Sequence, residues 1–199
     1  MHKPVSQPCL RNQDPIYQTL KLSFSQPGRV LELACGTGQH AVYLAQRLPH
    51  LSWQATDLLA ALAASKLWVE EAALANLLPP MELDVASRHW SDEKFDYVFA
   101  ANLVHFVSME RVKSMFAGIA RVLLPGGMLA LYGPYNNLGF TSAGNARLDA
   151  WLKNDIHPQA GIKELAAVCE LASQHKLTLV ENHLMPANNH LLLFKHEAI

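Results

Sequence analysis

The sequence of 199 residues predicts an α/β fold in which a doubly wound, mostly parallel, seven-stranded sheet ends in an antiparallel hairpin. Over the first two thirds of the chain, short apolar runs alternate with segments of helical periodicity, which is typical of strand–helix–strand units. The runs are apolar throughout, as expected for parallel strands buried on both faces. The last two, 177–181 and 191–195, are joined by too few residues for a crossover helix, so we expect an antiparallel pair.

Five strands, alternating with helices, form the expected parallel part of the sheet. We expect its strands at 29–34, 52–57, 81–85, 95–101 and 128–132. We expect helices at 15–22, directly after a glycine turn at 35–38, at 58–75 and at 108–124. Asp14 can cap the first helix, since Pro15 suits the first helical position. Pro125 and the two glycines after it end the last of these helices.

The composition limits the class of protein. Hydrophobic residues make up 50% of the chain and charged residues 17%, so it can bury a core, and without a linker we expect a single domain over 1–199. A net charge of -1 gives little attraction for nucleic acid, and no apolar run reaches the ~20 residues of a membrane-spanning helix. The three cysteines lack C-x-x-C spacing and the histidines are scattered, which predicts a cytoplasmic protein without disulfides or a metal site.

The glycine turn is the most informative segment. Gly36 and Gly38 stand between a strand and a helix, where glycines allow a sharp turn and the helix offers free N–H groups to a nucleotide-like ligand. Asp57 ends the next strand 21 positions after Gly36, about where a dinucleotide fold has its ribose-binding acid. No Gly-Lys-Ser/Thr follows the glycines, which excludes a triphosphate-binding loop.

Two ligands remain compatible with this turn. Gly36-x-Gly38-x-x-Ala41 fits the relaxed dinucleotide pattern, which would make the protein an NAD-dependent oxidoreductase. Glu32 favours a ligand with an ammonium group, such as S-adenosylmethionine (SAM), because a carboxylate there would repel a pyrophosphate. Both acids have structural alternatives, since Glu32 could cap local N–H groups and Asp57 could cap the helix that follows.

The pattern Glu32-x-Ala34-x-Gly36-x-Gly38 resembles the acid-x-small-x-Gly-x-Gly motif of class I SAM-dependent methyltransferases, which have a Rossmann-like fold. Alanine stands at position 34, where the usual motif has glycine. From about residue 11 to the C-terminus, the chain resembles the methyltransferase-like family catalogued as domain of unknown function 938. The segments that carry this resemblance are 31–45, 48–57, 81–85, 116–127, 131–135 and 185–189.

The resemblance implies a SAM site with roles for particular residues. Glu32 would bind the methionyl ammonium, Asp57 both ribose hydroxyls and Asp84 the adenine amino group. The backbone at 34–38 and Asn102 would line the methionyl part, while Leu58 and Val85 would sandwich the adenine. Asp84 could equally be an ordinary strand-end acid, Asn102 a turn residue, and the two apolar residues plain core. The implied cofactor-binding set is Glu32, Ala34, Cys35, Gly36, Gly38, Asp57, Leu58, Asp84, Val85 and Asn102.

The acceptor site is expected beyond the carboxyl ends of the fourth and fifth strands. His105 is the candidate general base, and Tyr135 with Trp151 could form an aromatic wall, although a helix-entry histidine and core aromatics explain them as well. We expect a lid at 136–160 and an N-terminal arm and helix at 1–26, whose Arg11 and Asn12 close the other side. The acceptor would be a small molecule or a small protein site, and a SAM-binding module without turnover is a third hypothesis.

Overall fold

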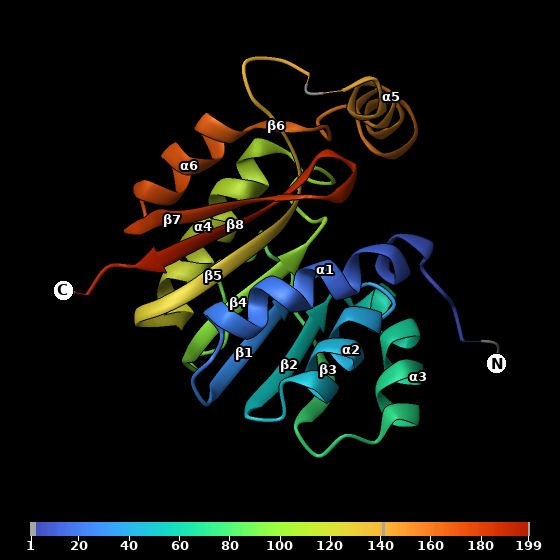
Figure 1. Cartoon of the computed structure of the whole chain (residues 1–199), viewed down its shortest axis with the longest axis vertical. Helices are drawn as coiled ribbons and strands as arrows, with labels where there is room; N and C mark the ends of the chain where they lie inside the picture. The colour runs from blue at the N-terminus through green and yellow to red at the C-terminus, as the bar shows by residue number, and fades with distance from the viewer. Residues whose placement is uncertain (1–2, 141, 199) are drawn as a thin grey trace.

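The computed structural model describes residues 3–140 and 142–198 and contains the expected doubly wound sheet, in the order β3-β2-β1-β4-β5-β8-β7 (Figure 1). The strands of this path are β1 Gly28–Leu33, β2 Leu51–Asp57, β3 Leu77–Glu82, β4 Phe95–Ala101, β5 Leu123–Asn136, β7 Leu177–Met185 and β8 Asn189–His196. The first five pair in parallel, whereas β8 runs antiparallel to both β5 and β7. The predicted fold class and hairpin are confirmed.

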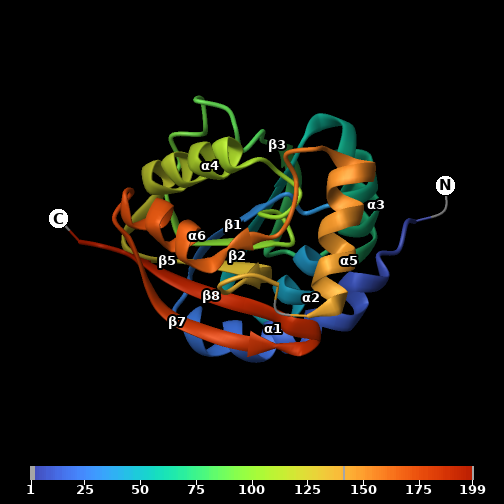
Figure 2. The same cartoon turned by 90° about the horizontal axis from the view of Figure 1, so that it is seen from above.

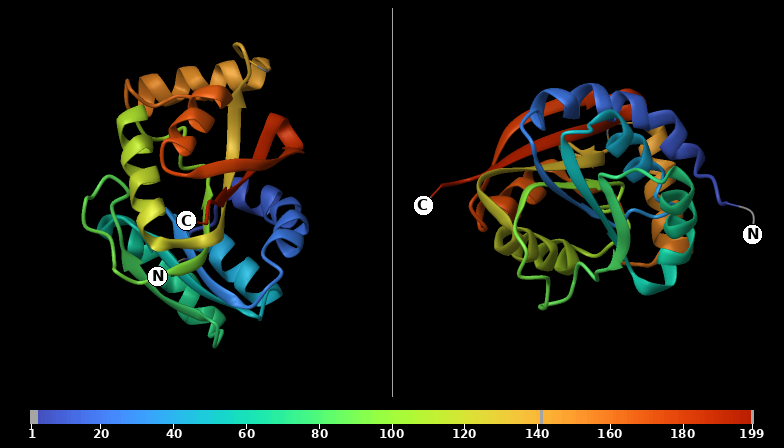
Figure 3. Two further views of the ribbon diagram at one scale, coloured as in Figure 1. Left: turned by 90° about the vertical axis from the view of Figure 1, so that its left-hand side faces the viewer. Right: turned by 90° about the horizontal axis from the view of Figure 1, so that it is seen from below.

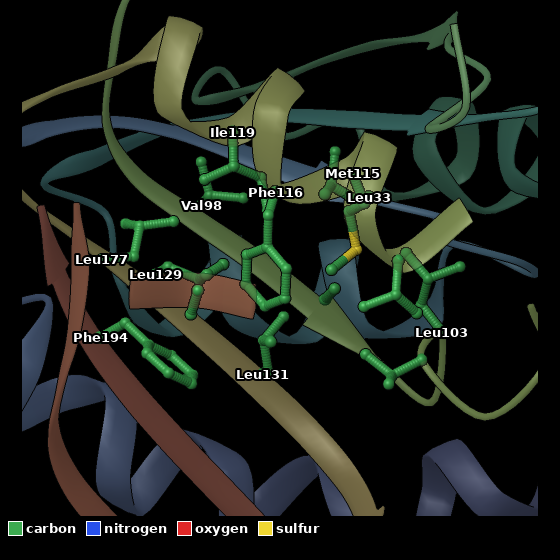
Figure 4. Packing of buried hydrophobic residues seen from close by; sticks show 14 of the residues in the cluster. Leu33, Val98, Leu103, Met115, Phe116, Ile119, Leu129, Leu131, Leu177 and Phe194 are labelled. Atoms are coloured by element: carbon green, nitrogen blue, oxygen red, sulfur yellow. The ribbon is translucent and has the colours of Figure 1, made fainter. Parts of the chain in front are cut away.

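Helices cover both faces of the sheet (Figure 2). On one face lie α1 Gln7–Ser23, α2 Gln39–Arg47 and α3 Leu62–Ala72, with a core that includes Leu44, Trp53 and Phe99. On the other face lie α4 Met109–Val122 and α6 Leu165–Ser173. Figure 4 shows Phe116 of α4 pointing toward Leu129 and Leu131 of β5. Burial of apolar side chains on both faces holds the central strands in place.

The remaining helical segment lies beyond the carboxyl ends of the strands. It consists of α5 Ala143–Trp151 and a π-helical turn, Leu152–Ile156. Figures 1 and 3 place α5 at the end of the molecule toward which the parallel strands run. The two-residue strand β6 Lys163–Glu164 follows and pairs in parallel with the last residues of β5. The chain after β5 therefore passes over the edge of the sheet where ligands of this fold class bind.

The first helix differs from the prediction. It begins at Gln7 instead of residue 15, because Ser6 is the N-cap and its hydroxyl accepts a hydrogen bond from Cys9 N. Pro8 occupies the first turn, where its missing N–H costs nothing. Pro15 lies inside the helix, so Asp14 is not a cap. Asp14 and Pro15 are residues that often begin a helix, but here the helix begins earlier, where Ser6 caps it.

The third strand and the helix before it also differ. The strand spans Leu77–Glu82 instead of 81–85, and its two prolines are tolerated because β3 is an edge strand. The pairing of β2 with β3 shifts between Gln54 and Thr56, and Gln54 Nε2 donates to Pro79 O at 2.9 Å. The helix expected at 58–75 is divided into a 3-10 turn, Leu59–Ala61, and α3.

Candidate functional site

The glycine turn connects β1 to α2 at the carboxyl edge of the sheet. Ala34, Gly36 and Gly38 all have positive φ angles, of 53°, 57° and 83°. A Cβ on Gly38 would lie 3.0 Å from Ser65 Cα in α3, so this position requires glycine for both its conformation and its space. Cys35 N donates to Thr56 O at 2.9 Å, which fixes the turn to the end of β2.

Glu32 lies at the carboxyl end of β1 and is only 1% exposed. Its Oε2 accepts a hydrogen bond from Trp53 Nε1 at 2.7 Å. Burial raises the pKa of Glu32 to about 8; the Trp53 hydrogen bond opposes this shift and the charge of Asp57 adds to it. Among the described residues no lysine, arginine or histidine forms an ion pair with Glu32. A buried acid without a counter-charge is suited to a cationic ligand.

Asp57 links the end of β2 to the glycine turn. Its Oδ2 accepts from Gly36 N and its Oδ1 from Leu58 N, each at 2.7 Å. The N-cap residues of the following helical segments are Leu58 and Ala61, so Asp57 itself is not the cap of either. A carboxylate oxygen can accept more than one hydrogen bond, which leaves capacity for ligand hydroxyls.

The adenine-side residues follow the ends of β2 and β3. Leu58 is half exposed, whereas Val85 is buried in the core cluster that packs on α4. Asp84 lies beyond the end of β3; its Oδ1 accepts from Ala86 N at 2.9 Å and pairs with Arg111 Nη1 at 3.2 Å. Arg111 of α4 was not anticipated, because this long-range pair leaves no local signal in the sequence.

The loop after β4 brings Asn102 and His105 against β5. Asn102 has φ 60° and its backbone N donates to Tyr132 O at 2.7 Å. The His105 ring lies beside Gly133, where a Cβ would be 3.4 Å from His105 Nδ1. Burial, together with the charge of Lys163, lowers the pKa of His105 to about 4. The structure thus brings Asn102, His105 and Gly133 together, with a histidine that is neutral near pH 7.

Tyr135 and Trp151 are not brought together. Tyr135 is 1% exposed in the core beneath α4 and α6, and burial raises the pKa of its hydroxyl, which has no described partner. Trp151 is 44% exposed at the end of α5, with its ring 6.2 Å from that of Phe106 in an edge-to-face contact. The wall that Trp151 forms therefore involves Phe106, whereas Tyr135 packs in the interior.

The predicted lid at 136–160 contains α5, and its residues Leu152 and Ala160 form a small apolar cluster with Ile162, which follows the lid. Asp149 joins the lid to this next segment: Oδ1 accepts from Ile162 N at 2.8 Å, and Oδ2 pairs with Lys153 Nζ at 2.6 Å. Gly161 N, directly after the lid, donates to His105 O in the loop after β4 at 2.8 Å. Thr141, inside the predicted lid, lies outside the described residues.

The first half of α1 packs beside the glycine turn. Asn12 is buried and its Oδ1 lies 2.7 Å from His40 Nε2, while Cys9 Sγ lies 3.8 Å from His40 Nδ1. Burial lowers the pKa of His40 to about 4, so this ring is neutral. Arg11 is exposed. The sequence singled out Arg11 and Asn12, but the network of Asn12 with α2 depends on packing that periodicity does not reveal.

A cavity of about 300 Å³ lies elsewhere, on the α4 side of β2 and β3. Thr56, Met81 and Trp90 are among the residues that line it. The connection between β3 and β4 contains no helix, so no helix from this segment covers that face, and the cavity remains there. The acids and glycines described above are not among its lining residues, so geometry and chemistry place the candidate site at the carboxyl edge instead.

The described part of the chain has no helix long and apolar enough to cross a membrane. Within residues 3–140 and 142–198, no three potential metal ligands gather into a metal site. Cys9, Cys35 and Cys169 are free thiols.

The fold is that of solved methyltransferase structures. The chain belongs to the family described as "Protein of unknown function (DUF938)", whose pattern matches residues 3–196. It is 33% identical over 115 residues to "Uncharacterized methyltransferase sll0829" of Synechocystis sp. (strain ATCC 27184 / PCC 6803 / Kazusa), covering 55% of this chain and 49% of that protein. It is 32% identical over 124 residues to "Trans-aconitate 2-methyltransferase" of Pseudomonas paraeruginosa (strain DSM 24068 / PA7), covering 61% and 42%. The chain thus matches less than half the length of either curated relative.

Solved structures agree on the fold. Apo SibL, a SAM-dependent methyltransferase, superimposes with a TM-score of 0.80 at 18% identity, over 96% of this chain and 56% of that one. An O-methyltransferase family protein from Burkholderia thailandensis gives 0.83 at 17%, over 96% and 57%. Human N-acetylserotonin methyltransferase in complex with SAM gives 0.78 at 13%, over 94% and 52%. At these identities the likeness defines the fold alone.

Proposed function

We propose that this protein is a SAM-dependent methyltransferase that transfers a methyl group to a small-molecule acceptor. One observation carries the proposal: Glu32 is a fully buried acid at the end of β1, without a described cationic partner, beside a glycine turn. SAM carries two positive charges, an ammonium group and a sulfonium. The ammonium, with or without the sulfonium, would compensate the charge of the buried carboxylate. A pyrophosphate would add negative charge next to Glu32 and Asp57, which disfavours the alternative NAD-dependent oxidoreductase.

The other residues at this edge support the same ligand. Asp57 has free lone pairs for the ribose hydroxyls, and the exposed face of Leu58 suits an adenine ring. We assign to Asp84 the role of accepting a hydrogen bond from the adenine amino group. The Asp84 carboxylate would then bind both this amino group and Arg111. The complete proposed set is Glu32, Ala34, Cys35, Gly36, Gly38, Asp57, Leu58, Asp84, Val85 and Asn102.

The chemistry asks little of the protein beyond placement. SAM supplies a methyl group on a good leaving group, so the chain has to align the acceptor and exclude water. We propose that the segment 136–160 acts as the lid and that the arm and helix at 1–26 close the methionyl side. His105 would contact the acceptor as a neutral hydrogen-bonding group, and Tyr135 would support it from the core. The free cysteines are consistent with a cytoplasmic location.

The names of the relatives support an acceptor of low molecular mass. One relative is named for trans-aconitate, and a structural neighbour is human N-acetylserotonin methyltransferase. For this chain we propose only the class, a small molecule, and we expect no nucleic acid partner because the net charge is -1.

Calorimetric titration tests the cofactor. S-adenosylhomocysteine, the demethylated product, should bind at micromolar levels, on the order of 8 kcal/mol, and NADH should give no saturable heat. Glu32→Gln should weaken the product's binding, whereas Glu70→Gln, on the exposed surface of α3, should not. Saturable binding of NADH together with no heat from SAM or its product would overturn the assignment.

A further inference from the structure

The carboxyl ends of β4 and β5 carry polar groups whose hydrogen-bonding capacity is unused. Six buried side-chain N or O atoms in the described part of the chain lack a partner, and two of them, His105 Nδ1 and Asn136 Oδ1, belong to the loop after β4 and to the last residue of β5. Both side chains are more than nine-tenths buried. Buried polar groups are normally paired, so unpaired ones at a ligand edge indicate a missing hydrogen-bond partner. His105 Nδ1 can donate to such a partner in one tautomer, whereas Asn136 Oδ1 can only accept.

Strand β6 brings a cation to the same place. Lys163 pairs with Tyr135 and Glu164 with Asn136, so β6 extends the sheet beside the end of β5. Lys163 is only 8% exposed, and its Nζ donates to Gln159 O at 3.2 Å. Burial lowers the pKa of Lys163 below the ordinary value for lysine, the charge of Asp149 opposes this shift, and the Lys163 charge in turn acts on the His105 ring. A partly buried ammonium without an ion-pair partner is suited to an anionic ligand.

The nearby acids are already engaged. Asp149 is bonded to Lys153 Nζ and Ile162 N, and Glu164 accepts from the backbone N of residues 138 and 139. Within the part of the chain that the structure describes, no carboxylate lies within ion-pair distance of Lys163. The loop 102–108 and the residues 133–136 contain no acid. The acceptor edge therefore has one cation without an ion-pair partner, Lys163, and one unused ring nitrogen, His105 Nδ1, that can face an anionic ligand.

We propose that the methyl acceptor is a small carboxylic acid, bound as its carboxylate by Lys163 with the His105 ring beside it, and converted to a methyl ester. The inference rests on the proposed function. One carboxylate oxygen forms the new O–CH₃ bond while the C–S bond of the sulfonium breaks, and the electron pair of that bond stays on sulfur. No proton leaves the acceptor, so the reaction needs no general base. A His105 that stays neutral is consistent with this chemistry, because it has only to hydrogen-bond.

The test separates the acceptor from the cofactor. The protein saturated with S-adenosylhomocysteine is titrated with citrate, succinate and phenylacetate, with the uncharged amides of the last two, and with inorganic phosphate. At least one carboxylate should bind, and its amide should bind at least tenfold more weakly. Lys163→Gln should lose about tenfold or more of the carboxylate affinity, as expected for a charge-assisted contact, while Lys163→Arg should stay within a few-fold. Lys66→Gln, an exposed lysine of α3, is the matched control for loss of charge.

Each outcome has a defined meaning. Undiminished affinity of Lys163→Gln for the carboxylate, equal binding of an amide or of phosphate, or no carboxylate binding at all would overturn the inference. The affinity for S-adenosylhomocysteine is measured for every variant and should not change with position 163. If the product itself does not bind, the proposed function fails, and the same titrations without it still decide whether Lys163 binds carboxylates. For a carboxylate that binds, transfer of labelled methyl should give a product from which alkali releases methanol, as a methyl ester requires.

Discussion

Binding of the methyl donor should depend steeply on pH because of Glu32. Burial raises the pKa of Glu32 to about 8 in the empty site, so most molecules hold this acid protonated at pH 6 to 7. A ligand ammonium requires the carboxylate, so binding must displace the proton. Affinity should then fall about tenfold for each unit of pH below 8, which is about 100-fold, or ~2.7 kcal/mol, between pH 7.5 and pH 5.5. Above about pH 8 the ligand's own amino group begins to lose its proton, so the affinity should be greatest near pH 8.

The assay is calorimetry with S-adenosylhomocysteine at pH 6.5 in two buffers of different ionisation enthalpy. The difference in apparent heat gives the protons released, and we expect close to one per site. Glu32→Gln should bind weakly with a flat profile over the same range, whereas Glu70→Gln should keep the wild-type slope. A wild-type affinity that changes less than threefold between pH 5.5 and 7.5, or release of no proton, would refute the reasoning.

Four further predictions concern stability and the turn. Because the pKa of Glu32 is raised from 4.5 to about 8, the free energy of unfolding of the empty protein should fall as pH rises through that window, by at most about 5 kcal/mol. Urea unfolding of Glu32→Gln should lack this part of the pH dependence. Trp53→Phe removes the hydrogen bond that favours the carboxylate, so the affinity profile should move to higher pH, as calorimetry would reveal. Asp57→Ala should cost roughly 1–3 kcal/mol of stability as well as ligand affinity, while Asp57→Asn, whose amide oxygen can accept one of the two backbone N–H bonds, should lose less stability than Asp57→Ala; equal stability of both would contradict this. Gly38→Ala should lower the melting temperature more than Gly126→Ala, since both have positive φ but only the former would meet the α3 backbone.

The features that the sequence predicted correctly depend on local chemistry or on chain length. Glycines between a strand and a helix allow the positive φ angles of a sharp turn, so the sequence alone predicts the turn at 35–38. The link between β7 and β8 is too short for a crossover, which left an antiparallel hairpin as the simplest arrangement. The positions of Glu32 before the turn and of Asp57 at 21 residues after Gly36 predicted two acids at one edge, and the structure has Glu32 next to the last residue of β1 and Asp57 at the end of the neighbouring β2.

The features that the sequence did not predict depend on contacts between distant segments. Strand β6 has two residues, too few for any periodic signal, yet it brings Lys163 beside the end of β5. The burial of His105 follows from Gly133 and the lid segment, neither of which is near it in sequence. Tyr135 was expected on an open wall, but nothing in the alternation of β5 distinguished a wall residue from a core residue. The position of Lys163, the burial of His105 and the burial of Tyr135 all depend on contacts between segments that are far apart in the sequence.

Glu32 and Lys163 have no ion-pair partner among the described residues, and the proposed reaction uses both. Glu32, once it has lost its proton, would bind the cationic donor, and Lys163 in β6 would bind the anionic acceptor. Before transfer, the bound donor and acceptor would give Glu32 and Lys163 partners of opposite charge. Their binding would remove the free-energy cost that the two unpaired groups impose on the empty protein. In the transition state the charges of sulfonium and carboxylate cancel, and this loss of charge is favoured in a site from which water is excluded. After transfer the sulfonium and the carboxylate are gone while the ammonium remains, so the methyl ester loses its hold on Lys163. The acceptor side should therefore release its product first, and the donor side should retain S-adenosylhomocysteine through Glu32.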